Sequence, residues 1–160
     1  MRVAAGLYRG GTSRGLIFSA SDLAMYSQRA REYIICSAMG SPDPDQRQID
    51  GVGGGVSSLS KAAVVSVPSR DRHMDRLSRM GEEWAFPGVP WADDVVRACD
   101  AETGYDAVYR FGQVPVSGGT GIDWSATCGN MMSAVAIHTY MKYWWHFRPF
   151  LLHVDPGASF

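Results

Sequence analysis

Cysteine is scarce in this chain, and its spacing excludes two kinds of protein. The 160 residues contain three cysteines, Cys36, Cys99 and Cys128, which lie far apart. An odd number of widely spaced cysteines is neither a disulfide framework nor a zinc-binding pattern. The four histidines also lack metal-ligand spacing. We therefore expect no metal site and a reducing compartment.

Charge of one sign and long apolar runs are missing as well. The net charge is −1, which favours neither nucleic acid nor an anionic membrane surface as a partner. No apolar run is long enough to span a bilayer, and the N-terminus is too short and polar for a signal peptide. We expect a cytoplasmic protein, with a mitochondrial location as the alternative.

The composition that remains is typical of one globular domain. Apolar residues make up 46% of the chain and charged residues 19%. Amphipathic spacing and a glycine stop predict a helix over 22–39, and a second helix is expected directly after Cys128. Short apolar runs bounded by turn residues predict the strands. These cover 3–9, 16–18, 62–67 and 107–116.

Two segments differ from this pattern. Residues 69–105 are rich in arginine, acidic residues and proline, and we interpret them as an insertion with a short helix at 92–99. Residues 137–160 form a tail dense in aromatic residues. An apolar end of this kind favours a surface that binds a partner, such as a second copy in a homodimer. The alternative is an aberrant C-terminal end.

Glycine is abundant, and the first glycine-containing segment joins two predicted strands. Paired glycines let backbone N–H groups converge on an anion. The hydroxyl groups of Thr12 and Ser13 and the guanidinium groups of Arg9 and Arg14 suit a carboxylate. The same sequence is also typical of a tight turn with solvated arginines. The segment reads Arg9-Gly10-Gly11-Thr12-Ser13-Arg14-Gly15.

The second segment is a glycine cluster at 51–55 that leads to Ser60 and Lys61. A phosphate-binding P-loop needs Gly-Lys-Ser/Thr at the start of a helix, whereas Lys61 here precedes a predicted strand. One hypothesis is a lid that presents Ser60 and Lys61 to a small anion, with the lysine as a carboxylate ligand or a base. The other is an exposed loop with a solvated lysine.

The third segment surrounds Cys128, which directly precedes a predicted helix. The helix dipole and free N–H groups at such a position favour a thiolate. Gly129 lets the backbone close on a ligand, and Asn130 both donates and accepts hydrogen bonds. This environment suits a cysteine that removes a proton from carbon. The alternative is a small core residue, which is our interpretation of Cys36.

Taken together, the segments resemble the 2-methylaconitate cis–trans isomerase (PrpF) family. Five matches follow the family's order and cover about residues 7–67 and 106–135. They are Arg9-Gly-Gly-Thr-Ser-Arg14-Gly15, Met39-Gly-Ser-Pro-Asp-Pro44 with Arg47-Gln-Ile-Asp-Gly51-Val-Gly-Gly54, Ser57-Ser-Leu-Ser-Lys61, Asp106-Ala-Val-Tyr-Arg-Phe-Gly-Gln-Val114, and Asp123-Trp-Ser with Cys128-Gly-Asn-Met131.

The resemblance implies a fold and a reaction. The fold would be like that of diaminopimelate epimerase: two similar α/β (α+β) domains, each with a mixed sheet wrapped around a central helix, and an active site between them. Residues 1–136 would be the N-terminal domain, and the second domain would be missing from a truncated chain. The reaction would be cofactor-independent cis–trans or double-bond isomerisation of an unsaturated di- or tricarboxylate, such as 2-methylaconitate or aconitate.

The resemblance also assigns residues to this reaction. Cys128 and Lys61 would be the catalytic acid–base pair. Nine further residues would hold the substrate carboxylates. They are Arg9, Gly10, Gly11, Thr12, Ser13, Arg14, Ser60, Gly129 and Asn130.

Several departures from the family pattern keep other hypotheses open. Arg14 stands where lysine is common, and the resemblance ends near residue 136. A half-cleft cannot exclude water, so we expect little turnover from this chain alone. One alternative is a non-catalytic fragment that binds a carboxylate or dimerises. Another is an amino-acid epimerase or racemase, but those enzymes pair two cysteines, and Lys61 with Cys128 favours the isomerase.

Overall fold

The computed structural model of the chain describes residues 2–66, 107–117, 121–144 and 152–154. The predicted insertion at 69–105 lies outside these residues, as do its helix at 92–99, Cys99 and most of the tail after residue 144. Within the described ranges, no helix is long and apolar enough to cross a membrane.

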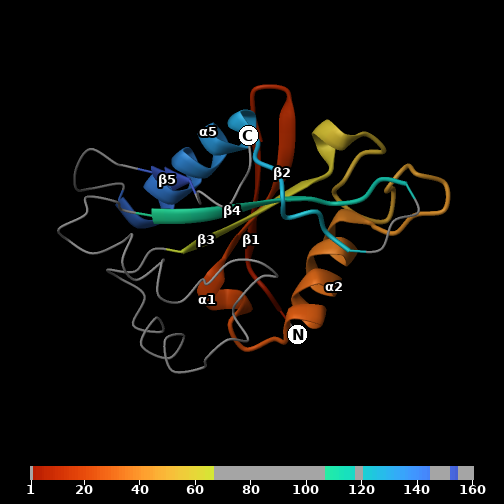
Figure 1. Ribbon diagram of the computed structural model, residues 1–160, viewed down its shortest axis with the longest axis horizontal. Coiled ribbons are helices and arrows are strands. Elements are labelled where there is room, and N and C mark those ends of the chain that lie inside the picture. The colour runs from red at the N-terminus through yellow and green to blue at the C-terminus, as the bar shows by residue number, and fades with distance from the viewer. Residues whose placement is uncertain (1, 67–106, 118–120, 145–151, 155–160) are drawn as a thin grey trace.

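One mixed sheet of five strands forms the centre of the structure, with the strands side by side in chain order (Figure 1). Strands β1 and β2 are antiparallel, as are β3 and β4, while β2–β3 and β4–β5 are parallel. The strands are β1 (Ala5–Gly10), β2 (Ser13–Ser19), β3 (Lys61–Ser66), β4 (Ala107–Gln113) and β5 (Leu152–Val154).

The β1–β2 hairpin is longer than the sequence predicted. Gly10 pairs with Ser13, so only Gly11 and Thr12 lie in the turn. Gly11 has a φ of 51°, in the left-handed region that glycine adopts readily. The prediction that residues 13–15 form a loop was therefore wrong. A two-residue turn lets strand pairing continue through these polar residues.

The helix predicted over 22–39 is interrupted and forms two helices, α1 (Ala20–Leu23) and α2 (Gln28–Met39). The prediction was wrong for the connection between them. Arg31 is buried there, and its Nε donates to the carbonyl oxygen of Leu23 at 2.9 Å. The predicted end of the helix is confirmed, because Gly40 has a φ of 78° and caps α2.

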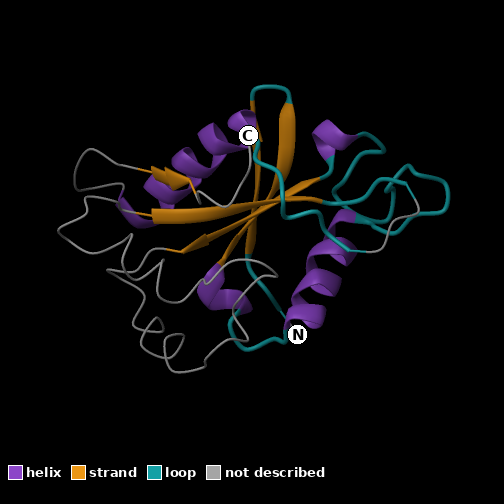
Figure 2. Ribbon diagram, in the orientation of Figure 1, coloured by secondary structure: helices purple, strands orange, loops and turns teal. Residues whose placement is uncertain are grey.

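Helices cover both faces of the sheet (Figure 2). Alternate strand residues such as Leu16 and Phe18 share one apolar cluster with Ile35 and Met39 of α2. Ile17 and the residues in register with it share a second cluster with α5 (Gly129–Thr139) on the other face. Helix α5 contacts strands β1 to β4. The predicted mixed sheet around a central helix is confirmed, and so is the helix after Cys128.

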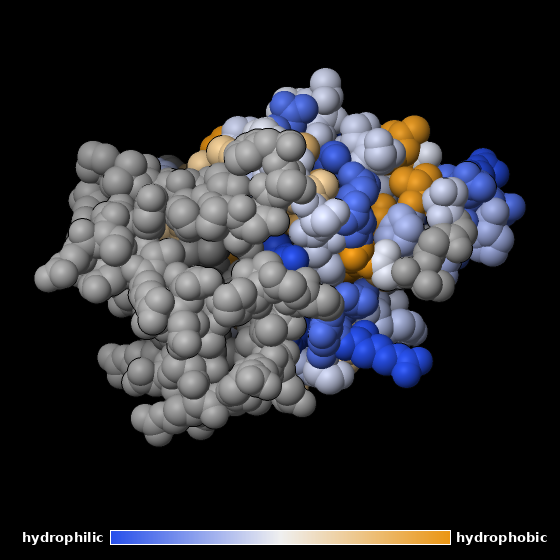
Figure 3. All heavy atoms as spheres, in the orientation of Figure 1, coloured by the Kyte–Doolittle hydropathy of each residue, from blue (hydrophilic) through white to orange (hydrophobic). Residues whose placement is uncertain are grey.

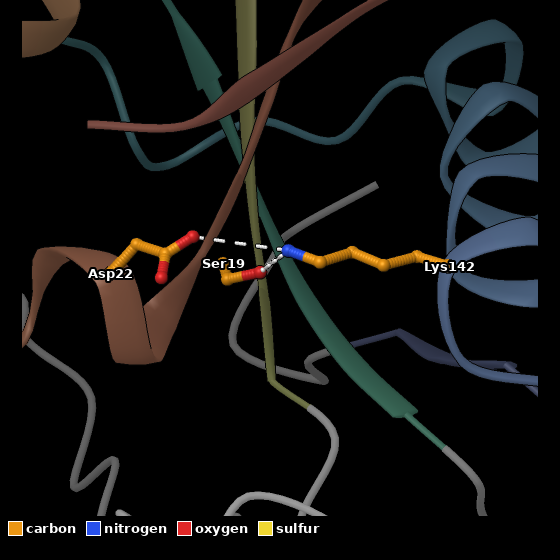
Figure 4. Close-up of polar contacts among 3 residues, drawn as sticks. All are labelled: Ser19, Asp22 and Lys142. Carbon is orange, nitrogen blue, oxygen red and sulfur yellow. Dashed lines mark hydrogen bonds and ion pairs between the residues drawn. The ribbon is translucent and has the colours of Figure 1, made fainter. Parts of the chain in front are cut away.

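The end of α5 is tied back to the sheet. The π-helix η3 (Tyr140–Trp144) follows α5 directly, so residue 136 lies inside continuous helix. Lys142 of η3 donates from Nζ to Ser19 Oγ at 2.5 Å and lies 3.8 Å from Asp22 Oδ2 (Figure 4). This contact joins the C-terminal end of the helical layer to the start of α1.

The connection between α2 and β3 carries exposed apolar side chains. Ile49 is 67% exposed and Val56 52% exposed. On the face that Figure 3 shows, apolar side chains stand among polar ones in this part of the molecule. The backbone of this connection is nevertheless organised, because the Asp43 carboxylate accepts hydrogen bonds from the N–H groups of Asp45, Arg47 and Gln48. These bonds hold the pKa of Asp43 below its usual value.

Candidate active site

The turn of the β1–β2 hairpin lies against the first residues of α5. A Cβ atom on Gly10 would overlap the carbonyl oxygen of Asn130, and one on Gly11 would lie 2.6 Å from Asn130 Oδ1. Asn130 Nδ2 donates to Thr12 Oγ1 at 3.1 Å. Glycine at positions 10 and 11 therefore allows the close approach of two segments that are more than a hundred residues apart in sequence.

Cys128 is the N-cap residue of α5 and lies beside this turn. Its side chain makes no capping hydrogen bond, and its Sγ lies 3.6 Å from Ser13 Oγ. The thiol is half-buried and packs against the apolar cluster under α5. Gly129, the next residue, is exposed, and a Cβ there would meet no atom within 4 Å. The open N–H groups of the helix start can therefore reach an anion.

Lys61 is the first residue of β3 and is nearly buried, with 9% of its surface exposed. It lies between Gly15 of β2 and Gln113 of β4 in the register of the sheet. Its Nζ donates to Gln113 Oε1 at 2.9 Å and lies 5.0 Å from the centre of the Phe111 ring. The lysine is therefore ordered within the sheet and is not a solvated loop residue.

Strand alternation places Lys61 and Cys128 on the same face of the sheet. Ser13, two residues before Gly15, faces the α5 side together with Ile17, and Lys61 faces that side together with Ala63. Neighbouring strands lie about 5 Å apart and alternate residues about 7 Å apart, so Ser13 and Lys61 are separated by roughly 8 Å between Cα atoms. The two residues predicted to exchange protons thus flank Ser13.

Arg14 and Ser60 lie apart from this group. Arg14 points to the opposite face of β2, and its NH2 group donates to the carbonyl oxygens of Val52 at 3.0 Å and Gly53 at 3.4 Å. Ser60 is fully buried, and its hydroxyl donates to Gln48 Oε1 at 2.6 Å. Both side chains therefore hold the glycine-rich connection. Arg9 is exposed, and its NH1 group donates to the Thr12 carbonyl at 3.5 Å.

Two residues beside the site escaped the sequence analysis, Gln113 and Tyr109. Gln113 is the partner of Lys61, but strand register cannot be read from one sequence. The Tyr109 hydroxyl lies 3.5 Å from Thr127 Oγ1. The pKa of Tyr109 is raised above its usual value, mainly by burial and also by the nearby Cys128, whereas the hydrogen bond with Thr127 lowers it. The Tyr109 side chain near Cys128 is therefore uncharged.

The described ranges contain no group of three or more potential metal ligands. The reactive groups that the described site contains are the Cys128 thiol, the Lys61 amine and the backbone N–H groups at the start of α5.

Comparisons with known proteins give one family model and several similar isomerases. The model of the PrpF protein family matches residues 1–77. The chain is 34% identical to the 2-methyl-aconitate isomerase of Shewanella oneidensis over 138 residues, which are 84% of this chain and 26% of that protein. It is 33% identical to the 4-oxalomesaconate tautomerase of Pseudomonas putida over 129 residues, 81% of this chain and 26% of that protein.

A solved structure with a similar fold is that of a methylitaconate-delta-isomerase. It has a TM-score of 0.64 and 23% identity, and the similarity covers 97% of this chain and 32% of that one. This chain therefore shares its fold with about a third of that protein. The match of the PrpF family model to residues 1–77 and the similarity to two 2-methyl-aconitate isomerases confirm the predicted resemblance. The chain spans about a quarter of the length of the curated relatives it matches.

Proposed function

We propose that this chain carries one wall of the active site of a cofactor-independent isomerase for unsaturated di- and tricarboxylates. The observation that carries the proposal is the half-buried Cys128 at the start of α5, 3.6 Å from Ser13 and on the same sheet face as Lys61. Support also comes from the relatives, whose names specify 2-methyl-aconitate, 4-oxalomesaconate and 3-methylitaconate. We further propose that this function is exerted in the cytoplasm.

The proposed mechanism is proton transfer at carbon. A thiolate at Cys128 removes a proton from a carbon next to the double bond, and the electron pair delocalises into the conjugated carboxylate as a dienolate. N–H groups at the start of α5 and the ammonium group of Lys61 stabilise that charge. After rotation or movement of the double bond, either Cys128 returns its proton to carbon, or Lys61 donates one and is reprotonated by the Cys128 thiol, so that both routes restore the thiolate and the ammonium group.

We propose different roles for the predicted substrate residues. Thr12 and Asn130 are exposed and hydrogen-bonded to each other, so a carboxylate can exchange for that bond. The hydroxyl group of Ser13 lies 3.6 Å from the thiol of Cys128. Arg14 and Ser60 support the glycine-rich connection, and we propose that they act on the substrate only through it.

The test is deuterium incorporation into trans-aconitate in D2O, followed by proton NMR. We expect exchange of the allylic protons that is slow, in keeping with the little turnover expected of this chain alone, and that falls by at least about a hundredfold in Cys128→Ala and Lys61→Met, as is typical for loss of a general acid–base group. Cys36→Ala is the matched control, because Cys36 packs against the cluster on the other sheet face. Equal exchange in wild type and Cys128→Ala would exclude the proposal.

A second candidate function is carboxylate binding without turnover. The observation that favours it is the exposure of Gly129 and Asn130 at the start of α5, because an open site cannot exclude water from the dienolate. In that case trans-aconitate shifts the backbone amide signals of Gly129 and Asn130 in NMR, but no deuterium enters it. Absence of both effects would remove this candidate as well.

A further inference from the structure

Gln113 makes the closest polar contact with Lys61. It is the last residue of β4 and lies opposite Lys61 in the β3–β4 pair. Its Oε1 accepts the hydrogen bond from Lys61 Nζ at 2.9 Å, and the other partner of this amine among the described residues is the ring of Phe111. Lys61 forms no ion pair with a carboxylate in the described part of the chain. A nearly buried cation is thus held by uncharged groups.

The orientation of the Gln113 amide is fixed by its other contacts. Its Nε2 donates to three carbonyl oxygens, those of Ser57 at 3.1 Å, Ser60 at 2.8 Å and Val114 at 3.2 Å. Carbonyl oxygens only accept and an ammonium group only donates. A flipped amide would therefore bring donors against the lysine and an acceptor against the carbonyls. The arrangement permits one orientation, with Oε1 directed at Lys61.

We propose that Gln113 is a positioning residue that holds Lys61 for an anionic substrate and ties it to the end of the glycine-rich connection. This inference deepens the proposed function and rests on it. The amide occupies one of the three N–H bonds of the ammonium group and adds no negative charge. Two N–H bonds and the full positive charge remain for a substrate carboxylate.

The tie to the glycine-rich connection follows from the same amide. The 3-10 helix η1 (Ser57–Leu59) and Ser60 end this connection, and two of the carbonyl groups that Gln113 binds belong to them. A displacement of the connection would remove two of the three acceptors of Nε2 and leave the amide less firmly held. The position of Lys61 thus depends on a loop that is remote from Cys128 in sequence.

The chain is well suited to a direct test, because it contains only two lysines, Lys61 and Lys142. In protein labelled with 15N-lysine, each ammonium group gives one NMR signal, and Lys142→Arg assigns them. We expect a protected Lys61 signal in the wild type. In Gln113→Met, which keeps the side-chain volume, exchange of the Lys61 protons with water becomes about tenfold faster, because a hydrogen bond to a charged group is lost.

Gln113→Glu separates positioning of the lysine from support of the loop. The glutamate keeps an acceptor for Lys61 but loses the Nε2 donors to the carbonyl groups. We expect the Lys61 signal to remain protected in Gln113→Glu, whereas a role confined to the loop would make it behave as in Gln113→Met. Gln28→Leu is the control and leaves both lysine signals unchanged. Circular dichroism verifies the fold of each variant, and Gln113→Leu replaces Gln113→Met if the latter does not fold.

Titration with trans-aconitate tests the role of charge. We expect binding to Gln113→Glu to be about tenfold weaker than to the wild type, because the glutamate carboxylate competes for the ammonium group. Equal affinity, or an unchanged Lys61 signal in Gln113→Met, overturns the positioning role. The proposed function is contradicted by a different result, in which the wild type neither binds trans-aconitate nor exchanges its protons. In that case the NMR signals of Lys61 in the Gln113 variants still test whether Gln113 positions the lysine.

Discussion

Single residues decide how closely the parts of the site approach one another. Gly10 and Gly11 let the hairpin turn touch Asn130, and Gly129 leaves space at the helix start. The sequence predicted that glycines allow close backbone approach, but it could not say to what, since the partner of the turn is more than a hundred residues away. The close approach itself can be tested by adding one methyl group.

Gly10→Ala is expected to destabilise the protein, because the new Cβ would overlap the backbone of Asn130 and force the hairpin away from α5. Overpacking of this kind costs about 1–3 kcal/mol in the free energy of unfolding, which urea denaturation measures. Gly129→Ala is the matched control, since its Cβ would contact no atom within 4 Å. Equal stability of the two variants would contradict the packing of turn against helix.

Cys36 is expected to react slowly with alkylating reagents at neutral pH. Burial, assisted by the charge of Glu32, raises the pKa of Cys36 to about 11. Because the thiolate is the reactive form, roughly one Cys36 in a thousand is reactive at pH 8, and its rate rises about tenfold per pH unit. Alkylation by iodoacetamide at several pH values, read by peptide mass spectrometry, measures this rate. A Cys36 rate that reaches its plateau below pH 9 would contradict the burial of this thiol.

At the scale of elements, the sequence predicted which segments form strands and helices better than where they begin. The helix before Gly40 and the helix after Cys128 were found, because apolar spacing and glycine stops are local properties. The break between α1 and α2 was missed because it depends on Arg31, whose guanidinium group binds backbone carbonyls eight and seven residues earlier. In a sequence, an arginine within a helical pattern is expected to face solvent, so the burial of Arg31 could not be predicted.

Arg31→Met is therefore expected to destabilise the α1–α2 junction. The carbonyl groups of Leu23 and Ala24 would lose their donors, and a hydrogen bond from a charged group contributes about 1.5–3 kcal/mol. Thermal or urea unfolding measures the loss. Arg29→Met, an exposed position on the same helix, is the control and should leave stability nearly unchanged. A similar loss in both variants would show that the effect is not specific to the junction.

At the scale of the whole molecule, the sequence predicted the fold class and the resemblance to a family, because five motifs retain their order along the chain. It could not identify the contacts that join distant strands, such as Gln113 with Lys61, or show that Arg14 and Ser60 bind the glycine-rich connection. Those contacts depend on strand register and on which face a side chain occupies. One buried group also makes the stability of the whole domain depend on pH.

His138 is buried beneath β1, and neither of its ring nitrogens has a hydrogen-bond partner among the described residues. Burial, assisted by the nearby Lys142, lowers its pKa. The folded protein thus binds this proton less readily than the unfolded chain, so stability present above about pH 6.5 is lost as the pH falls through the lowered pKa.

His138→Phe preserves the ring that packs edge-on against Tyr8, with ring centres 5.0 Å apart in the wild type. We expect this variant to lose less stability than the wild type between pH 7.5 and pH 5, as measured by urea unfolding at each pH. The difference between the two proteins in how the free energy of unfolding changes with pH is the contribution of His138. Parallel curves for the two proteins would contradict this contribution.

The pairing of β3 with β4 has a consequence for how this domain tolerates added sequence. Lys61 and Gln113 pair at one end of the two strands, and Ser66 and Val108 pair at the other. The chain therefore leaves and re-enters the sheet at neighbouring points, about 17 Å from the lysine. Because the entropic cost of closing a loop rises only slowly with its length, this end can accept a fluorescent or affinity module without disturbing the chemistry at the opposite end. The end of the sheet at Ser66 and Val108 is thus a suitable attachment point for immobilisation or labelling, because it lies far from Lys61.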